Sequence, residues 1–71
     1  MIPGKLYKTF IGHVSFDKGK HVPNKSLFIL LVIEDVMDIY CDIKITVLYK
    51  TQTLVRDMRK EQFFLWFKEV E

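Results

Sequence analysis

The sequence predicts a small, mainly β domain. Two runs of strand-type residues, 26–36 and 39–49, follow each other with only Met37 and Asp38 between them, which indicates a strand pair at the centre of the fold. The chain has 71 residues, and 49% of them are hydrophobic, which suffices for one compact core and argues against disorder. We therefore expect residues 1–71 to form one domain.

A first strand is expected at residues 5–11, after a turn at Pro3 and Gly4. Residues 13–25 are rich in Lys, His, Gly, Pro and Asn, with a few apolar residues spaced among them. This composition predicts a long loop that is attached to the core by its apolar side chains. Loops of this kind often carry function.

The middle of the chain predicts three further strands. Residues 27–33 are apolar without alternation, which predicts a central strand covered on both faces and ending at Glu34. In residues 43–49 apolar and polar positions mostly alternate, which is typical of a strand with one face in solvent. A short turn then leads to a fourth, shorter strand at 53–56.

The end of the chain has two interpretations, because residues 63–67 are aromatic or apolar throughout. Asp57 is a suitable helix cap and Glu61 suits a first helical turn, so we expect one turn of helix and then a closing strand within 65–70. The alternative is an α+β domain, in which residues 57–68 form a full amphipathic helix against an antiparallel sheet.

These elements are the ordered parts of a five-stranded barrel of the Src-homology-3-like type: five short strands, a long loop after the first and a helical turn before the last. A closed barrel leaves no strand edge unpaired and lets few residues enclose one core. An open meander of strands is the main alternative.

A family resemblance rests on residues spread over most of the chain. They are Gly4, Leu6 and Tyr7, Pro23 followed by Leu27, Phe28 and Leu30, then Val47, Leu48 and Tyr49, and the aromatic ending at 63–67. In these positions the sequence resembles the short barrel proteins encoded by tailed phages, including marine ones. The resemblance implies a barrel fold and a viral origin, with action in the cytoplasm of a host cell. It implies no catalytic residue, since the shared positions are core and turn residues.

Residues with catalytic or metal-binding chemistry do not form a motif. His13 and His21 are eight positions apart, whereas zinc ligands usually come in pairs two to four residues apart. Cys41 is followed by Asp42, and a neighbouring carboxylate disfavours the thiolate that a nucleophile needs. A glycine-rich phosphate loop is absent from the sequence. We therefore expect a protein that is not an enzyme and uses no metal or cofactor.

Charge and cysteine content point to an intracellular, cytoplasmic protein. The net charge is only +2, but residues 1–33 and 43–60 are basic whereas 34–42 are acidic. Cys41 is the only cysteine, so no internal disulfide can form, and no secretory signal precedes the first strand. The longest apolar run has seven residues, too few for a membrane-spanning helix, so no membrane partner is expected.

The long loop supplies the predicted binding site, which mixes basic and aromatic side chains. Its residues are Phe16, Lys18, Lys20, His21 and Lys25, with Tyr7 expected to add a ring beside them. We interpret this set as a surface that binds a host or viral protein, with rings as anchors and lysines that steer an acidic partner.

The sequence also allows two other partners. A nucleic acid is the alternative ligand, with exposed rings of Tyr7, Phe16 and Tyr40 stacking on bases and lysines contacting phosphates. In addition, residues 63–67 hold more apolar surface than one side of a short segment can bury, which allows a homo-oligomer through this aromatic segment.

Overall fold

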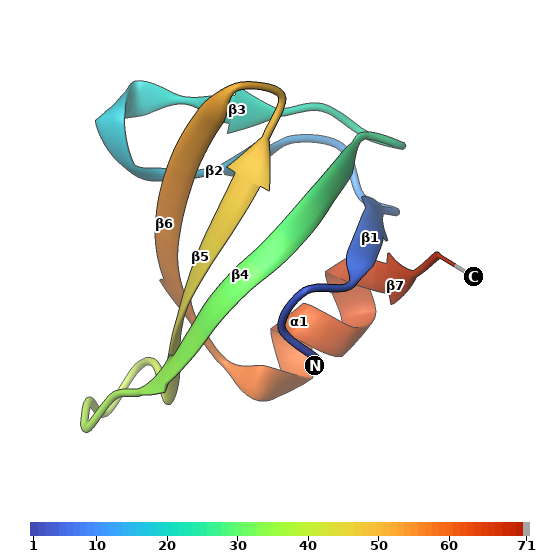
Figure 1. Cartoon of the computed structure of the whole chain (residues 1–71). Helices are drawn as coiled ribbons and strands as arrows, with labels where there is room; N and C mark the ends of the chain where they lie inside the picture. The colour runs from blue at the N-terminus through green and yellow to red at the C-terminus, as the bar shows by residue number, and fades with distance from the viewer. Residues whose placement is uncertain (71) are drawn as a thin grey trace.

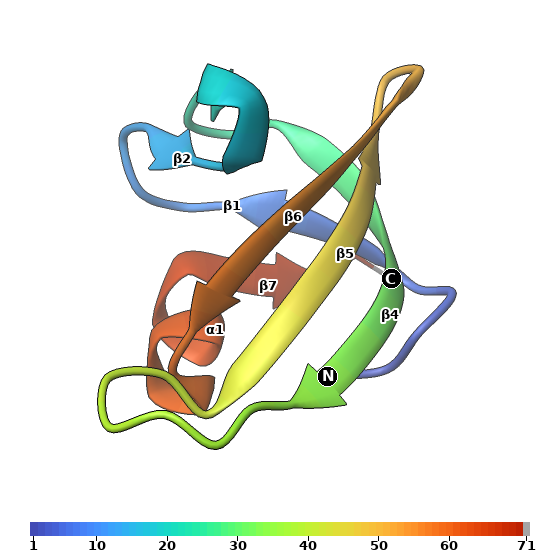
Figure 2. The ribbon, with the colours of Figure 1, turned by 90° about the vertical axis from the view of Figure 1, so that its left-hand side faces the viewer.

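The computed structural model describes residues 1–70, which form a curved antiparallel sheet of five strands, a small separate hairpin and one short helix (Figures 1 and 2). The sheet strands are β1 (Leu6–Thr9), β4 (Leu27–Asp35), β5 (Ile43–Tyr49), β6 (Gln52–Met58) and β7 (Phe67–Glu69). The hairpin pairs β2 (Val14–Ser15) with β3 (His21–Val22) around a 3-10 turn, η1 (Asp17–Gly19), and the helix is α1 (Lys60–Trp66).

The sheet bends but does not close. Its strand order is β6-β5-β4-β1-β7, so β6 and β7 are the two edges and do not pair with each other. In Figure 2, β1 and β7 cross behind the layer of β5 and β6, and α1 lies beside β7. The prediction of a mainly β domain with one short helix is confirmed, whereas the predicted closed barrel is wrong. In the chain, α1 connects the two edge strands β6 and β7, and it places the buried Phe63 in the interior.

β4 is the central strand, as expected, but only one of its faces is covered. Phe28 and Leu30 are buried, whereas Leu27 is exposed on the other face. The register with β5 shifts between Leu30 and Val32, which marks a β-bulge. After the bulge, Ile33 packs against the core and Val32 is exposed. The expectation of cover on both faces is therefore wrong, since the uninterrupted apolar run contains a bulge and an exposed side.

The end of the chain follows the first of its two interpretations. One short helix, α1, leads directly into β7, so a full helix over 57–68 is wrong. Asp57 does not cap the helix, because it lies within β6. Asp42 from the segment before β5 supplies a carboxylate instead, and its Oδ1 accepts the N–H of Lys60 at 2.9 Å.

The long loop at 13–25 is a hairpin rather than an irregular excursion. Val14 and Val22 pair across it and are fully buried, which confirms that apolar side chains attach this segment to the core. The C-terminal end of this segment is held by Thr9, which is also buried. The Thr9 Oγ1 donates to the carbonyl of Pro23 at 2.9 Å and accepts the N–H of Ser26 at 3.0 Å.

Four aromatic rings form the centre of the core and join four elements. They are Tyr7 of β1, Phe28 of β4, Phe63 of α1 and Phe67 of β7. Phe63 lies edge-to-face with Tyr7 and with Phe67, at centroid distances of 5.2 and 5.1 Å, and Phe28 meets Phe67 in the same way at 4.9 Å. This edge-to-face geometry is favourable beyond the area that the rings bury. The cluster therefore ties α1 and β7 to β1 and β4 of the sheet.

Phe63 and Phe64 are adjacent on α1 and make a matched pair for testing this core. Phe63 is fully buried and Phe64 is exposed. We expect Phe63→Ala to lower the free energy of unfolding by about 3–5 kcal/mol, because it opens a cavity among three other rings. Phe64→Ala should lower it by about 1 kcal/mol or less. Urea titration followed by circular dichroism measures both values, and equal losses in the two variants would contradict the assigned orientation of α1.

Candidate functional site

Two aromatic residues of the predicted binding site lie in the core. Tyr7 packs between Phe28 and Phe63, and its hydroxyl accepts the N–H of Ile2 at 2.9 Å. Phe16 is also buried, although its edge lines a hollow described below. Tyr7 and Phe16 could contact a protein or a nucleic acid only if their rings were exposed, and both rings are buried. They belong to the scaffold because their positions face inward from β1 and from the end of β2.

The basic residues of the predicted site are exposed, but they occupy turns. Lys18 lies in η1 and Lys25 lies between β3 and β4, each with positive φ, at 59° and 62°. Such backbone geometry is costly for a residue with a Cβ and is common only in tight turns. Lys20 is exposed where η1 meets β3. That these lysines bind a partner stays a prediction. Lys18 and Lys25 also form the turns of the hairpin segment.

The hairpin also brings two histidines together that the sequence places eight positions apart. The rings of His13 and His21 are perpendicular, with centroids 6.4 Å apart, and the Ser15 Oγ lies 3.2 Å from the Nδ1 of His21. Within residues 1–70, no group of three or more His, Cys, Asp or Glu side chains is arranged to hold a metal ion. Cys41 belongs to the segment between β4 and β5, at the other end of the sheet (Figure 1), so it forms no pair with either histidine.

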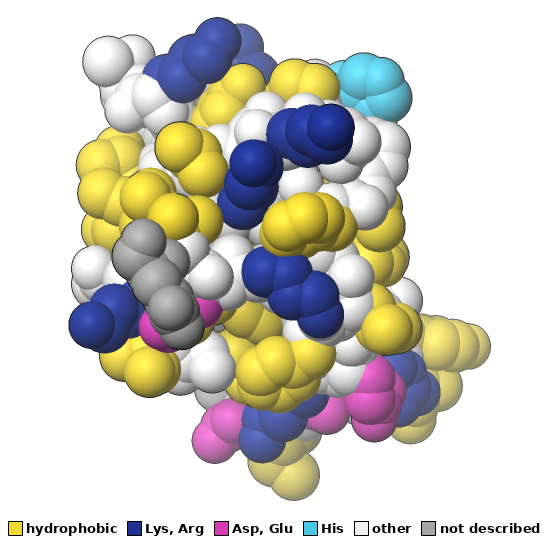
Figure 3. Space-filling model, turned by 90° about the vertical axis from the view of Figure 1, so that its right-hand side faces the viewer, with side chains coloured by type: hydrophobic (Ala, Val, Ile, Leu, Met, Phe, Trp, Pro, Cys, Tyr) yellow, Lys and Arg dark blue, Asp and Glu magenta, His cyan; other side chains and the backbone are white. Residues whose placement is uncertain are grey.

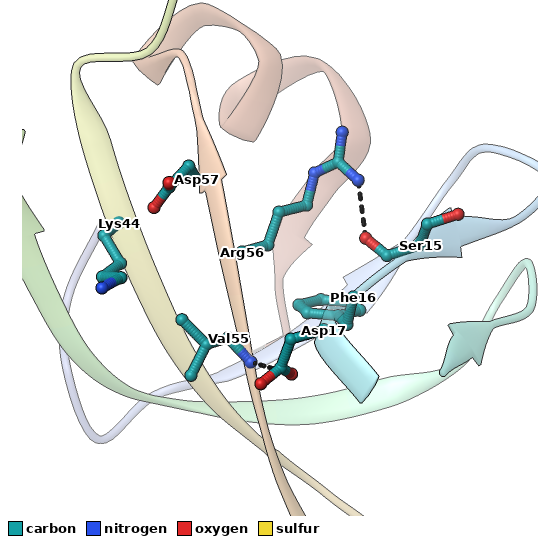
Figure 4. Close-up of a pocket in the computed structure, with 7 residues that line it drawn as sticks. All are labelled: Ser15, Phe16, Asp17, Lys44, Val55, Arg56 and Asp57. Carbon is teal, nitrogen blue, oxygen red and sulfur yellow. Dashed lines mark hydrogen bonds between the residues drawn. The ribbon is translucent and has the colours of Figure 1, made fainter. Parts of the chain in front are cut away.

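A shallow hollow of about 690 Å³ opens between the hairpin and the edge strand β6 (Figure 4). Its lining residues are Ser15, Phe16, Asp17, Lys44, Val55, Arg56 and Asp57. Arg56 Nη1 donates to the carbonyl of Ser15 at 2.6 Å, and Asp17 Oδ1 accepts the N–H of Val55 at 2.9 Å. Both bonds have their donor on β6 and their acceptor on the hairpin, so they hold the hairpin against the edge of the sheet.

Two of the charged side chains that line this hollow, those of Arg56 and Asp17, make contacts within the fold. The Arg56 guanidinium lies over the Trp66 ring, 5.0 Å from its centroid, and this cation–π contact joins β6 to α1. The carboxylate of Asp17 accepts a hydrogen bond from the Val55 N–H of the edge strand. Covering an edge in this way protects it from pairing with another chain. The hollow is therefore better described as a joint between elements than as a ligand site.

The most exposed apolar side chains lie elsewhere, in residues 36–42 between β4 and β5, called here the tip loop. Met37 is 104% exposed, Ile39 77% and Tyr40 74%. Large apolar side chains grouped on one exposed segment commonly mark an interaction site, whereas single exposed ones need no explanation. The tip loop projects beyond the end of β4, away from the rest of the sheet (Figures 1 and 2).

Hydrogen bonds hold the tip loop in a defined conformation. The N–H of Val36 donates to the carbonyl of Asp42 at 3.0 Å, which closes the base of the loop, and the N–H of Tyr40 donates to Asp38 Oδ1 at 3.0 Å. Arg59 Nη2 donates to the carbonyl of Ile39 at 3.2 Å and so links the loop to the start of α1. The exposed side chains therefore project from a backbone that is fixed at several points.

Carboxylates flank the apolar residues of the tip loop in the sequence. Glu34 and Asp35 end β4, Asp38 lies inside the loop, and Asp42 closes it. The sequence showed this acidic block, but the prediction of a tight turn at Met37 and Asp38 placed Ile39 and Tyr40 inside a strand. Asp38 was the signal for a longer structured loop, because an Asp side chain readily accepts the backbone N–H two residues on, here that of Tyr40.

Comparisons of the chain with protein-family models, with curated proteins and with solved structures find no match. Among residues 1–70, no helix has the length and apolar character needed to cross a membrane.

The joint at the hollow makes a testable contribution to the edge strand. We expect Asp17→Ala to expose the N–H of Val55 and to speed its hydrogen exchange roughly fivefold, as loss of about 1 kcal/mol of hydrogen bonding would. Asp57→Ala is the matched control, because its carboxylate lines the same hollow without accepting that N–H. Exchange measured by NMR decides the outcome, and unchanged protection of Val55 in Asp17→Ala would contradict this role.

Proposed function

We propose that this chain is a non-enzymatic protein-interaction module and that the tip loop is its binding element. One observation carries the proposal: Met37, Ile39 and Tyr40 are largely exposed on a loop whose backbone is fixed by hydrogen bonds. Fully burying one such side chain in an interface contributes roughly 1.5–3 kcal/mol. A fixed backbone supports binding further, because little conformational entropy is lost when a preorganised loop docks.

The charges around the tip loop indicate the chemistry of the partner. Glu34, Asp35, Asp38 and Asp42 lie within or next to the tip loop in the chain, and Arg59 is the cation that contacts the loop backbone. A complementary protein surface would have an apolar cleft with a basic rim, since apolar contacts provide affinity while opposite charges direct the encounter. An anionic membrane surface would repel the same carboxylates, so it is a poor match for this loop.

The fold supports a more specific proposal about architecture. In chain order the elements are a strand, a hairpin excursion, three consecutive strands, a helix and a last strand beside the first. We propose that this arrangement is an opened form of a Src-homology-3-like barrel, in which α1 separates the two edge strands. A phage origin, with a host or viral protein as the partner in the cytoplasm, remains a prediction from the resemblance of the sequence.

The tip loop itself does not favour a nucleic acid as the ligand. Tyr40 is its only ring, and Asp38 and Asp42 lie in the same loop. Phosphate groups would be repelled at this position. Binding of a protein is therefore the function that the geometry of the tip loop supports best.

Site-specific photocrosslinking tests the proposal. A photoreactive amino acid at position 37 should yield a covalent adduct with a protein in lysate of the source organism, because Met37 is fully exposed at the proposed interface. The same probe at position 27 is the control, since Leu27 is exposed at the opposite end of β4.

A titration with the purified partner completes this test. Ile39→Ser and Tyr40→Ser should each weaken binding at least roughly tenfold, the loss expected when an interface anchor is truncated. Leu27→Ser should leave the affinity within about twofold, as is usual for a residue outside an interface. Absence of an adduct specific to position 37, or an affinity unaffected by the two tip-loop changes, would refute the proposal.

A further inference from the structure

A second surface, separate from the tip loop, lies on the outer side of β1 and β7. Tyr7 and Thr9 are buried, so the alternation along β1 places Lys8 and Phe10 on the outer side. Lys8 lies directly opposite Lys68 in the register of β1 with β7. Figure 3 shows the side of the molecule on which β1 and β7 lie, and there Lys and Arg side chains are interspersed with hydrophobic ones, while Asp and Glu side chains gather toward the lower end.

The opposed lysines are an unfavourable pair within the sheet. Like charges directly opposite each other on neighbouring strands are destabilising. Lys68 is exposed and its Nζ donates to the carbonyl of Phe64 at 2.9 Å, so one ammonium is directed along the face toward α1. An anionic ligand lying along this face would offset the repulsion between the two strands.

Two exposed aromatic rings accompany these lysines. Phe10 is 52% exposed and Phe64 is 53% exposed. The N–H of Phe10 donates to the carbonyl of Trp66 at 2.8 Å, and the carbonyl of Phe64 accepts from Lys68, so both residues adjoin the start of β7. We call the set of Lys8, Phe10, Phe64 and Lys68 the β1–β7 face.

We infer that the β1–β7 face binds single-stranded nucleic acid. Each base of a single strand can stack on an exposed ring, while lysines contact the phosphates between successive bases. An acidic peptide would use the lysines but gain little from two flat rings. A duplex keeps its bases stacked inside, out of reach of Phe10 and Phe64. The inference is independent of the tip loop, which lies among carboxylates.

Fluorescence anisotropy with labelled oligothymidine and oligouridine tests the inference on the whole chain. Binding is expected at low salt and should weaken as salt rises, with a slope of roughly −1.4 in log–log form if two phosphates are neutralised. Phe10→Ala and Phe64→Ala should each weaken binding roughly 5- to 150-fold, the range for loss of one stacking platform. Phe10→Leu preserves bulk but removes the ring, so it should weaken binding in the same range even if Phe10→Ala disturbs folding.

Two control variants separate this face from general attraction to charge. Tyr40→Ala removes a more exposed ring from the tip loop and should leave binding of the oligonucleotide unchanged. Lys44→Gln removes a lysine whose register partners are Glu34 and Asp57, and it should alter binding less than Lys68→Gln does.

Four outcomes would overturn the inference. They are no change in anisotropy up to roughly 100 μM protein, affinity unaffected by the changes at Phe10 and Phe64, equal binding of duplex and single strand, and displacement of the oligonucleotide by polyglutamate at matched charge concentration. The last of these would assign the face to acidic proteins instead.

Discussion

The edge-to-face packing of Phe63 against Tyr7 and Phe67 is the interaction on which the rest of this structure depends. A five-stranded sheet with two free edges has no closed interior of its own. Phe63 reaches into the concave side from α1, and Phe67 continues from the same segment into β7 beside β1. One short aromatic segment thus covers the sheet and positions its last strand.

This way of enclosing the core separates the apolar residues of the chain into two groups. Thirteen buried hydrophobic residues form one cluster, from Tyr7 to Phe67. The remaining large apolar side chains lie around this cluster, either partly buried against it or exposed, and the most exposed of them belong to the tip loop. The tip loop is attached to α1 by Arg59 and Asp42, so the helix that completes the core also fixes the loop proposed to bind a partner.

Much of the fold was predictable from the sequence because local patterns determine it. The alternation in residues 43–49, the central position of 27–33 and a helical turn followed by a strand at 60–69 are all present in the structure. Closure was not predictable, since it depends on whether the two edge strands meet in space. The bulge after Leu30 was also hidden, because a run of apolar residues looks the same on either side of a register shift.

The candidate sites were harder to predict, because exposure is a property of the assembled fold. Tyr7 and Phe16 have the residue types of a binding surface, but their positions face the core. Phe10 was not singled out, and Phe64 was expected only as part of the aromatic segment 63–67. The pairing of β1 with β7 places Lys8 opposite Lys68, and hydrogen bonds bring Phe10 and Phe64 to the same strand pair. The hairpin similarly brings His13 and His21 together although their spacing in sequence suggested separation.

Aromatic NMR of the whole chain tests the central claim most directly, through nuclear Overhauser effects from the ring of Phe63. The account requires contacts from this ring to the rings of both Tyr7 and Phe67, since their centroids lie 5.2 and 5.1 Å away. A Phe63 ring that shows contacts only to its neighbours within α1 would contradict it. The helix would then be detached from the sheet, and neither the core nor the anchored tip loop described above would exist in solution.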